Sequence, residues 1–418
     1  MQDDCRIAKV FFVMKKYIIL TPSVGDMGGA QMYTANKAEY LKANGWNVAV
    51  YYSLPYKQLL IDGLKAFDGN YLPDMQYSIQ FLPKKRVEKV LNTICQDSGS
   101  YDEIVVETQL VALVGWGEMM AKRIGGRHVV NFLEEHPHSL SGREARYFEF
   151  KLKRQEILNA SEMSLKRLFG VYYKEEYLRY EHKSGFFCSN VVSDVSFDHS
   201  SIVHADFNVL TIGRLDKPYI ETLVKELKKF SSGNPKHSFN IHFVGGSNSG
   251  TVEKNIEQEL GGIENVNLYM YGFVYPIPSG LVEMADVAVG SANSILVTSE
   301  RGCPTICIDM ADYGGIGVFD YTTINKFKRT TEPFVPISEL LEEVLIKKSI
   351  NVDKKERTNK DSGRSQSQME ESVRYIKSMD EKKEYFDDKE IYGPLERCYC
   401  HAKWLIHQYV GVKREKKG

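Results

Sequence analysis

The chain has 418 residues, 43% hydrophobic and 26% charged, the composition of a folded globular protein rather than a disordered one. Its 54 basic and 55 acidic side chains give a net charge of -1, which argues against a nucleic-acid partner. The length fits two or three domains, and the seven cysteines lack regular spacing, which favours a reducing compartment over a disulfide framework.

The first half of the chain alternates short apolar runs with stretches of helical spacing. Helices are predicted over Ala30–Asn44, which Gly45 ends, and over Ala112–Ile124. This alternation predicts a parallel sheet covered by helices on both faces. The predicted strands are Tyr17–Leu20, Val48–Tyr52, Glu103–Val106, His128–Phe132 and Phe186–Cys188.

The same alternation restarts after a polar segment, Val192–Ala205, that has no periodic pattern and is the candidate linker. A second parallel sheet is therefore predicted. Its strands are Asn208–Ile212, Asn240–Val244, Val266–Tyr271, Ala285–Val289 and Thr305–Asp309, and its helices are Tyr219–Phe230, Ser279–Met284, Ile295–Arg301 and Ile337–Ile346.

These patterns predict an N-terminal domain over residues 15–195 and a C-terminal domain over residues 205–348. Residues 349–390 are dense in charge and predict a mobile or solvated helical excursion, and residues 391–418 predict a closing helix. No run reaches the roughly 18 apolar residues of a membrane span, and two lysines interrupt the apolar N-terminal run. We therefore expect a cytoplasmic protein.

A glycine-rich loop, Gly25–Ala30, follows the first predicted strand. Gly28 and Gly29 would let the backbone approach a ligand, and the following helix offers unpaired amides to an anion. The loop does not fit the dinucleotide fingerprint. A structural turn and a ligand loop both remain open.

Two cations, Arg214 and Lys217, follow Gly213 at the end of the first strand of the second domain. Ligands of open parallel sheets bind at the carboxyl ends of strands, and a guanidinium and an ammonium both suit a diphosphate. The alternative is a pair of solvated surface cations.

A third segment, Gly290–Pro304, turns from a strand into a helix near Ser294. The amides of Ser294, Ile295 and Leu296 could bind a phosphate. Glu300, further along this helix, could accept hydrogen bonds from two ribose hydroxyls, or it could be an ordinary surface glutamate.

Together these segments resemble the GT-B glycosyltransferases of the family-four type, over roughly residues 16–348. The resemblance rests on Gly28-Gly29-Ala30, Gly45-Trp46-Asn47-Val48-Ala49-Val50, Gly213-Arg214-Leu215 with Lys217, Ala285 to Ser291, and Glu300-x-Gly302-x-Pro304-Thr305-Ile306. It implies two Rossmann-like parallel-sheet domains that face a cleft. It also implies retaining transfer of a sugar from a nucleotide-sugar donor to a glycan or lipid-linked acceptor, in polysaccharide or glycoconjugate biosynthesis, without a cofactor or catalytic metal.

The resemblance also implies roles for individual residues. Arg214 and Lys217 would neutralise the leaving nucleoside diphosphate, Glu300 would hold the ribose, and Gly28 and Gly29 would approach the donor. The chain departs from the family at Ala292, where the first of two glutamates is expected, and in the short spacing between its two cations. A GT-B sugar-nucleotide epimerase and a non-catalytic GT-B partner subunit therefore remain alternatives.

Two further segments bear on the acceptor. Glu134 and His136 follow a strand of the first domain, where either could orient or deprotonate an acceptor hydroxyl; a local turn and a metal site are alternatives. The stretch Arg143–Arg167 mixes basic and apolar residues. It predicts either a helix packed on the first domain or peripheral contact with the inner face of a membrane.

Overall fold

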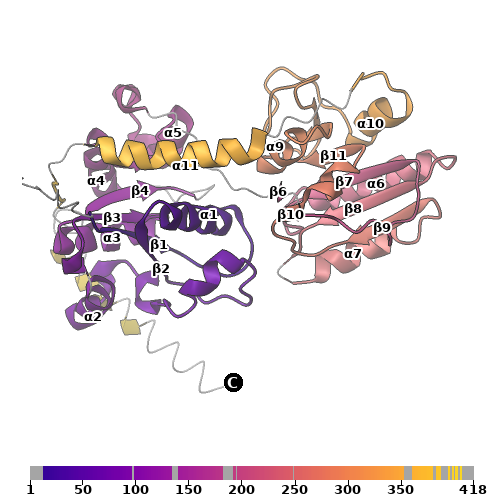
Figure 1. The fold of residues 1–418 in the computed structure, drawn as a ribbon. Helices are drawn as coiled ribbons and strands as arrows, with labels where there is room; N and C mark the ends of the chain where they lie inside the picture. Colours follow the sequence, from indigo (N-terminus) through magenta and orange to yellow (C-terminus); the bar gives the residue numbers. More distant parts are fainter. Residues whose placement is uncertain are drawn as a thin grey trace, which may run out of the picture. The chain divides into compact units, whose positions relative to one another are not determined.

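The structure is a computed structural model. It describes residues 13–96, 98–133, 140–181, 192–193, 195–247, 249–352, 360–379, 383–386, 394–395, 398–399, 401–402 and 405–406. The chain divides into a first unit, Met1–Ser189 with Gln366–Gly418, and a second unit, Asn190–Ser365. Each has a sheet of its own (Figure 1).

The sheet of the first unit has the strand order β2-β1-β3-β4-β5, and all of its pairings are parallel. Strand β1 is buried along nearly its whole length, as expected for a parallel strand covered on both faces. The strands are β1 (Lys15–Thr21), β2 (Trp46–Tyr52), β3 (Glu103–Thr108), β4 (Arg127–Asn131) and β5 (Ile157–Leu158).

Helices connect these strands and cover the sheet. The α-helices are α1 (Gly29–Ala43), α2 (Lys84–Cys95), α3 (Val111–Ile124), α4 (Gly142–Lys153) and α5 (Glu162–Phe169). Short 3₁₀-helices are η1 (Asp62–Phe67), η2 (Pro73–Gln76), η3 (Ile79–Phe81), η4 (Ser98–Ser100), η5 (Gly170–Tyr172) and η6 (Glu175–Tyr180).

The two faces of this sheet differ in chemistry. Ile18 and Leu20 of β1 lie in a buried apolar cluster with Trp116 of α3 and residues of α2. Because side chains alternate along a strand, the opposite face meets α1, where Lys37 Nζ lies 2.9 Å from Glu107 Oε2. This face therefore buries an ion pair beside apolar side chains such as Ala38 and Leu41 of α1.

The C-terminal part of the chain returns to the first unit through α11 (Lys360–Ser378). Figure 1 shows α11 in yellow beside α1, and Lys37 Nζ donates a 3.1 Å hydrogen bond to Ser372 Oγ. The Tyr375 hydroxyl donates to the Gln155 carbonyl, and the amide of Phe386 donates to Glu118 Oε1 at 2.7 Å. Residues from the far end of the sequence thus complete the packing of the first unit.

The second unit has a sheet with the order β13-β12-β11-β7-β8-β9. All of its pairings are parallel except that of β12 with β13. The strands are β7 (Phe207–Ile212), β8 (Phe239–Val244), β9 (Val266–Met270), β11 (Val287–Gly290), β12 (Thr305–Ile308) and β13 (Gly315–Val318); β6 (Val192–Ser193) pairs with β10 (Ile277–Pro278) in a small second sheet.

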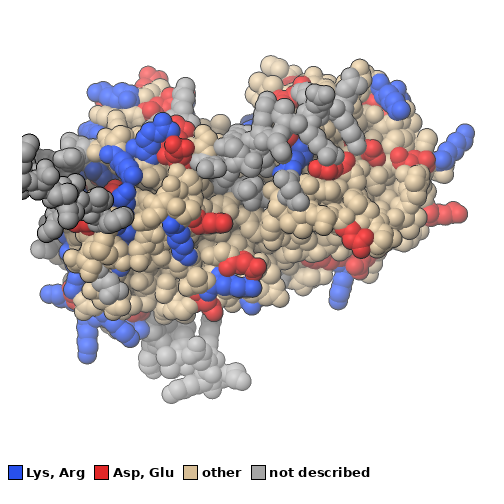
Figure 2. Space-filling view, in the orientation of Figure 1, with Lys and Arg blue, Asp and Glu red and all other residues tan. Residues whose placement is uncertain are grey.

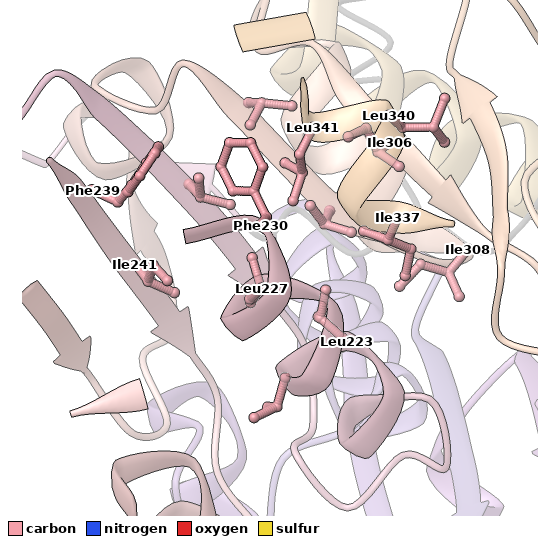
Figure 3. Packing of buried hydrophobic residues seen from close by; sticks show 14 of the residues in the cluster. Leu223, Leu227, Phe230, Phe239, Ile241, Ile306, Ile308, Ile337, Leu340 and Leu341 are labelled. Carbon is pink, nitrogen blue, oxygen red and sulfur yellow. The ribbon is translucent and has the colours of Figure 1, made fainter. Parts of the chain in front are cut away.

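A large apolar cluster lies at the centre of the packing of this unit. Leu227 and Phe230 of α6 pack against Phe239 of β8, and Ile306 of β12 and Leu341 of α10 join the same cluster (Figure 3). The helices are α6 (Ile220–Gly233), α7 (Thr251–Leu260), α8 (Ser279–Glu283), α9 (Asn293–Ser299), α10 (Ile337–Leu341) and the π-helix η7 (Glu342–Ile346).

The predicted α/β class with two parallel-sheet domains is confirmed. Within the predicted linker, Val192 and Ser193 form β6, and the ring of Phe197 lies 5.9 Å from that of Tyr271. The antiparallel strand β13 was not predicted. The predicted strand Phe186–Cys188 lies outside the described residues, as does most of the predicted closing helix; the domain limits stay predictions.

The stretch Arg143–Arg167 buries the apolar side chains that membrane contact would need. Phe148, Leu152, Ile157 and Leu165 all lie in one core cluster of the first unit. This agrees with the packing alternative, and membrane contact stays a prediction. None of the helices among the described residues is both long and apolar enough to cross a bilayer.

Candidate functional site

The loop after β7 brings two chain segments unusually close together. Gly213 and Gly245 follow the adjacent strands β7 and β8, with φ angles of +143° and +139°. A Cβ on Gly245 would lie 1.9 Å from the Gly213 carbonyl oxygen. Only glycine fits this contact, since any side chain would collide with backbone.

Two cationic residues, Arg214 and Lys217, follow Gly213 in this loop. The side chain of Arg214 is 53% exposed, and its Nε lies 3.5 Å from Asp216 Oδ1. Lys217 Nζ lies 5.7 Å from the centre of the Tyr219 ring and 3.7 Å from the position that a Cβ on Gly213 would occupy. Lys217 also lines a 510 Å³ hollow with residues of α6 and α7. An exposed ion pair such as Arg214–Asp216 is weak, so the guanidinium can exchange it for an anionic ligand.

A buried hydroxyl lies in the same turn. Tyr219 is fully buried, and its hydroxyl finds no hydrogen-bond partner in the described part of the chain. Burial raises the pKa of this phenol above its usual value, so it stays protonated. The sequence did not single out Tyr219, because a tyrosine at a helix start is an ordinary core residue.

The second loop of interest follows β11, the strand that pairs with β7. Ala292, the residue before α9, has φ 64° and ψ -129°, which is strained for any residue but glycine. Ser294 Oγ accepts from the Ser291 amide at 3.2 Å and donates to the Ser291 carbonyl at 2.8 Å. Ile295 is fully buried and Leu296 partly so. The Ser294 hydroxyl is thus used to shape the turn.

Strand pairing places the two loops at one edge of the sheet. Strands β7 and β11 are parallel neighbours, with Val287 opposite Val209 and Ala288 opposite Leu210. From this pair the chain winds outward in both directions, through β8 and β9 on one side and β12 on the other. That reversal is the switch point at which open α/β sheets bind ligands beyond the carboxyl ends of their strands. The structure therefore brings the loop of Gly213, Arg214 and Lys217 together with the loop before Ser294.

Glu300 lies at the other end of α9 from the turn at Ala292. It follows the last residue of α9, and seven helical residues span about 10 Å. Because α9 connects two parallel strands, it starts at the carboxyl edge of β11 and runs toward the amino edge of β12. The ribose contact that the resemblance implies for Glu300 stays a prediction.

A loop that the sequence analysis did not identify, which contains Lys326 and Arg329, is hydrogen-bonded to this edge of the sheet. The carbonyl of Lys326 accepts the Ala292 amide at 3.1 Å. Asp309, buried directly after β12, accepts the amides of Ala311 and Arg329 at 2.8 and 2.9 Å. The sequence feature that could have identified this loop is Asp309, a carboxylate directly after an apolar strand.

In the first unit, the predicted glycine loop lies between β1 and α1. Gly28 precedes α1 in extended conformation, and nothing lies within 4 Å of a Cβ placed on Gly29. The backbone is thus open at the amino end of α1, a helix without an acidic residue in its first turn. Glu134 and His136 lie outside the described residues. In the described part of the chain no group of three or more His, Cys, Asp or Glu side chains is placed to hold a metal ion.

No protein-family model matches the sequence, and comparison with curated proteins gives no match. Comparison with solved structures does give matches along most of the chain. HepE from Anabaena, solved with UDP and glucose, is 15% identical; the match covers 87% of this chain and 100% of HepE, with a TM-score of 0.51. The pneumococcal O-GlcNAc transferase GtfA, solved with UDP and GlcNAc, is 9% identical, with 87% and 99% covered and a TM-score of 0.52.

A UDP-GlcNAc 2-epimerase from Neisseria meningitidis is also similar, at 12% identity, 87% and 100% coverage and a TM-score of 0.45, which is too low to support an argument. At such identities a likeness concerns the fold alone. HepE and GtfA are GT-B enzymes, and both match this chain across both of its sheet-bearing units. The chain therefore has the GT-B fold, as its sequence predicts.

Proposed function

We propose that this chain is a glycosyltransferase that moves a sugar from a nucleoside-diphosphate sugar to a glycan or lipid-linked acceptor. One observation carries the proposal. Arg214 and Lys217 lie in the loop that follows β7, next to the loop that follows β11, at the switch point of the second unit's sheet. HepE and GtfA, which share the fold, were solved with UDP and a sugar. This supports a nucleotide-sugar as the donor.

The chemistry of the proposed step needs positive charge at the leaving group. When the bond between sugar and diphosphate breaks, negative charge grows on the leaving oxygen, and fixed positive groups lower that barrier. The guanidinium of Arg214 offers a bidentate fork and Lys217 offers a point charge. The amides at the start of α9 would add hydrogen bonds to the phosphates.

The acceptor belongs to the first unit in this proposal. Glu134 or His136 of this unit would orient the attacking hydroxyl. Gly28 and Gly29, which follow the carboxyl end of β1, would let the glycine loop of this unit approach the donor. Retention at the anomeric carbon, a place in polysaccharide or glycoconjugate synthesis and a cytoplasmic location beside the membrane are further parts of the proposal. They rest on the sequence resemblance.

A ligand panel tests the donor site. Thermal unfolding would be followed with UDP, GDP, ADP and their sugars, because a ligand that binds only the folded chain raises the melting temperature. We expect at least one nucleoside diphosphate to raise it and the matching monophosphate to raise it less, since Arg214 and Lys217 would bind the second phosphate. If no nucleotide binds, the catalytic proposal fails in favour of a partner subunit.

A second assay separates transfer from isomerisation. With the bound nucleotide-sugar and no acceptor, we expect slow release of nucleoside diphosphate and no change in the sugar. Release should accelerate when the correct acceptor is added. An acceptor-independent change in the configuration of the donor sugar would instead establish the epimerase alternative.

A further inference from the structure

Three tyrosines of the first unit form a connected row that starts at the glycine loop. A Cβ on Gly25 would lie 2.0 to 2.4 Å from atoms of Tyr56, so the Tyr56 side chain packs directly on the Gly25 backbone. The Tyr56 ring lies 5.7 Å from the Tyr52 ring, and Tyr52 stacks on Tyr71 at 5.4 Å and 27°. The Tyr71 side chain is 38% exposed at the far end of this row.

Main-chain hydrogen bonds hold the row in place. Hydrogen bonds join the loop after β1 to the loop after β2. The amides of Ser53 and Leu54 both donate to the Pro22 carbonyl, and the amide of Asp26 donates to the Gln58 carbonyl. Tyr71 extends the sheet edge, because the amide of Tyr52 donates to the Asn70 carbonyl and that of Leu72 to the Tyr52 carbonyl. The exposed ring therefore sits on a rigid support and needs little ordering when a ligand binds.

A carboxylate accompanies the rings. The hydroxyl of Tyr56 donates to Asp68 Oδ1, and that of Tyr52 donates to the Asp68 carbonyl at 2.5 Å. Asp68 is exposed. No described residue donates to its Oδ2. An ionised carboxylate accepts strong hydrogen bonds from hydroxyl groups.

We propose that Tyr71, Tyr56 and Asp68 form a binding surface for a sugar ring of the acceptor. An aromatic face packs against the C–H face of a sugar, while the neighbouring carboxylate binds the hydroxyls at the ring edge. The row begins on the glycine loop, at the carboxyl edge of β1 and β2, in the unit that the proposal assigns to the acceptor. This inference rests on the proposed transferase activity and narrows its acceptor to one that carries a saccharide at this surface.

The test measures saccharide binding by the full-length chain. The labelled protein would be applied to a printed array of oligosaccharides, and the strongest binder would be titrated by NMR. We expect Tyr71→Leu to weaken binding about fivefold or more and Tyr71→Phe to retain it, because the ring is the contact. Asp68→Asn should weaken it by a smaller factor, while Tyr172→Ala, which removes a 40% exposed tyrosine elsewhere in the first unit, should change nothing.

Two outcomes would overturn the inference: no saccharide that binds with Kd below about 10 mM, or equal binding by the parent chain and Tyr71→Leu. UDP binding, measured on the same samples, separates this failure from that of the proposed function. If UDP binds but no saccharide does, only the proposed saccharide surface is refuted. If saccharide binding depends on Tyr71 but no nucleotide binds, the saccharide surface is supported and the proposed transferase activity is refuted.

Discussion

At the scale of single residues, the proposed donor site depends on two glycines and one arginine. Gly213 and Gly245 allow two backbones to approach where no side chain fits, and Arg214 leaves that turn with an exposed guanidinium. In the view of Figure 2, basic and acidic side chains are interspersed over the surface. Position at the sheet edge therefore distinguishes Arg214 from other surface cations.

Replacing Arg214 with alanine should weaken nucleoside-diphosphate binding about tenfold or more, since a charge-assisted bond to phosphate is lost. Lys228→Ala is the matched control, because Lys228 on α6 is 49% exposed and also paired with a carboxylate, Glu259. Titration calorimetry with UDP, or with the nucleotide found in the panel, measures both. Equal affinities in the two variants would remove Arg214 from the site.

Gly245→Ala should destabilise the second unit by several kcal/mol, because the added Cβ collides with the Gly213 carbonyl and the φ angle is also unfavourable. Gly250→Ala isolates the second effect, since Gly250 has φ +68° with open space around it, and should cost only about 1 kcal/mol. Urea unfolding, followed by fluorescence, compares them. A similar loss in both variants would mean that the contact relaxes.

At the scale of elements, α1 is fixed to the sheet by a buried ion pair. Burial alone would raise the pKa of Glu107, but the charge of Lys37 and hydrogen bonds from Tyr17, Lys37 and Asn131 outweigh it and lower that pKa. Its partner Lys37 also reaches Tyr33 and Ser372, so one ammonium joins α1, β3 and α11. Removing either member of such a pair leaves a buried charge uncompensated.

Lys37→Met should cost about 3–5 kcal/mol at pH 7, and the double variant Lys37→Met/Glu107→Gln should cost less. In the parent, the lowered pKa of Glu107 means that its contribution is complete at pH 7 and lost only in acid. In Lys37→Met, burial should raise that pKa, so the variant should recover stability as the pH falls from 7 to 5.

Melting temperatures of the parent and both variants at pH 7 and pH 5 measure this effect. The difference between Lys37→Met and the parent should shrink at the lower pH, while the double variant should show no such change. A pH-independent difference would show that Glu107 does not titrate in the variant.

At the scale of the whole molecule, the first unit is built from both ends of the sequence. Met369, Val373 and Ile376 of α11 are buried, and Glu118 receives the Phe386 amide on one oxygen while Lys151 and His128 occupy the other. Burial alone would raise the pKa of Glu118, but Lys151 and His128 lower it to about 2. The C-terminal residues thus cover a buried, charged network.

Deleting residues 366–418 should lower the melting temperature of the first unit markedly, because it exposes this network and the apolar face beneath α11. Nucleotide affinity should stay within about twofold, since Arg214 and Lys217 belong to the second unit. Differential scanning calorimetry and titration with UDP measure the two effects separately. An unchanged melting profile would show that the C-terminal contacts contribute nothing to stability.

The sequence by itself determined the local elements and the class of fold. Apolar runs such as Asn208–Ile212, helical spacing and glycines at helix ends depend on neighbours only a few residues away, so the alternation of strands and helices could be predicted. The glycines and cations that follow those strands were predicted as site candidates for the same reason.

Only the tertiary structure decided which candidates share an edge. Strand order depends on pairings between residues far apart in sequence, such as Ala288 with Leu210, and no local pattern encodes them. The same holds for Ser372, which contacts Lys37 although 335 residues separate the two in sequence. Periodicity reports which face of an element is buried, whereas the partner that covers that face is chosen by packing across the whole fold.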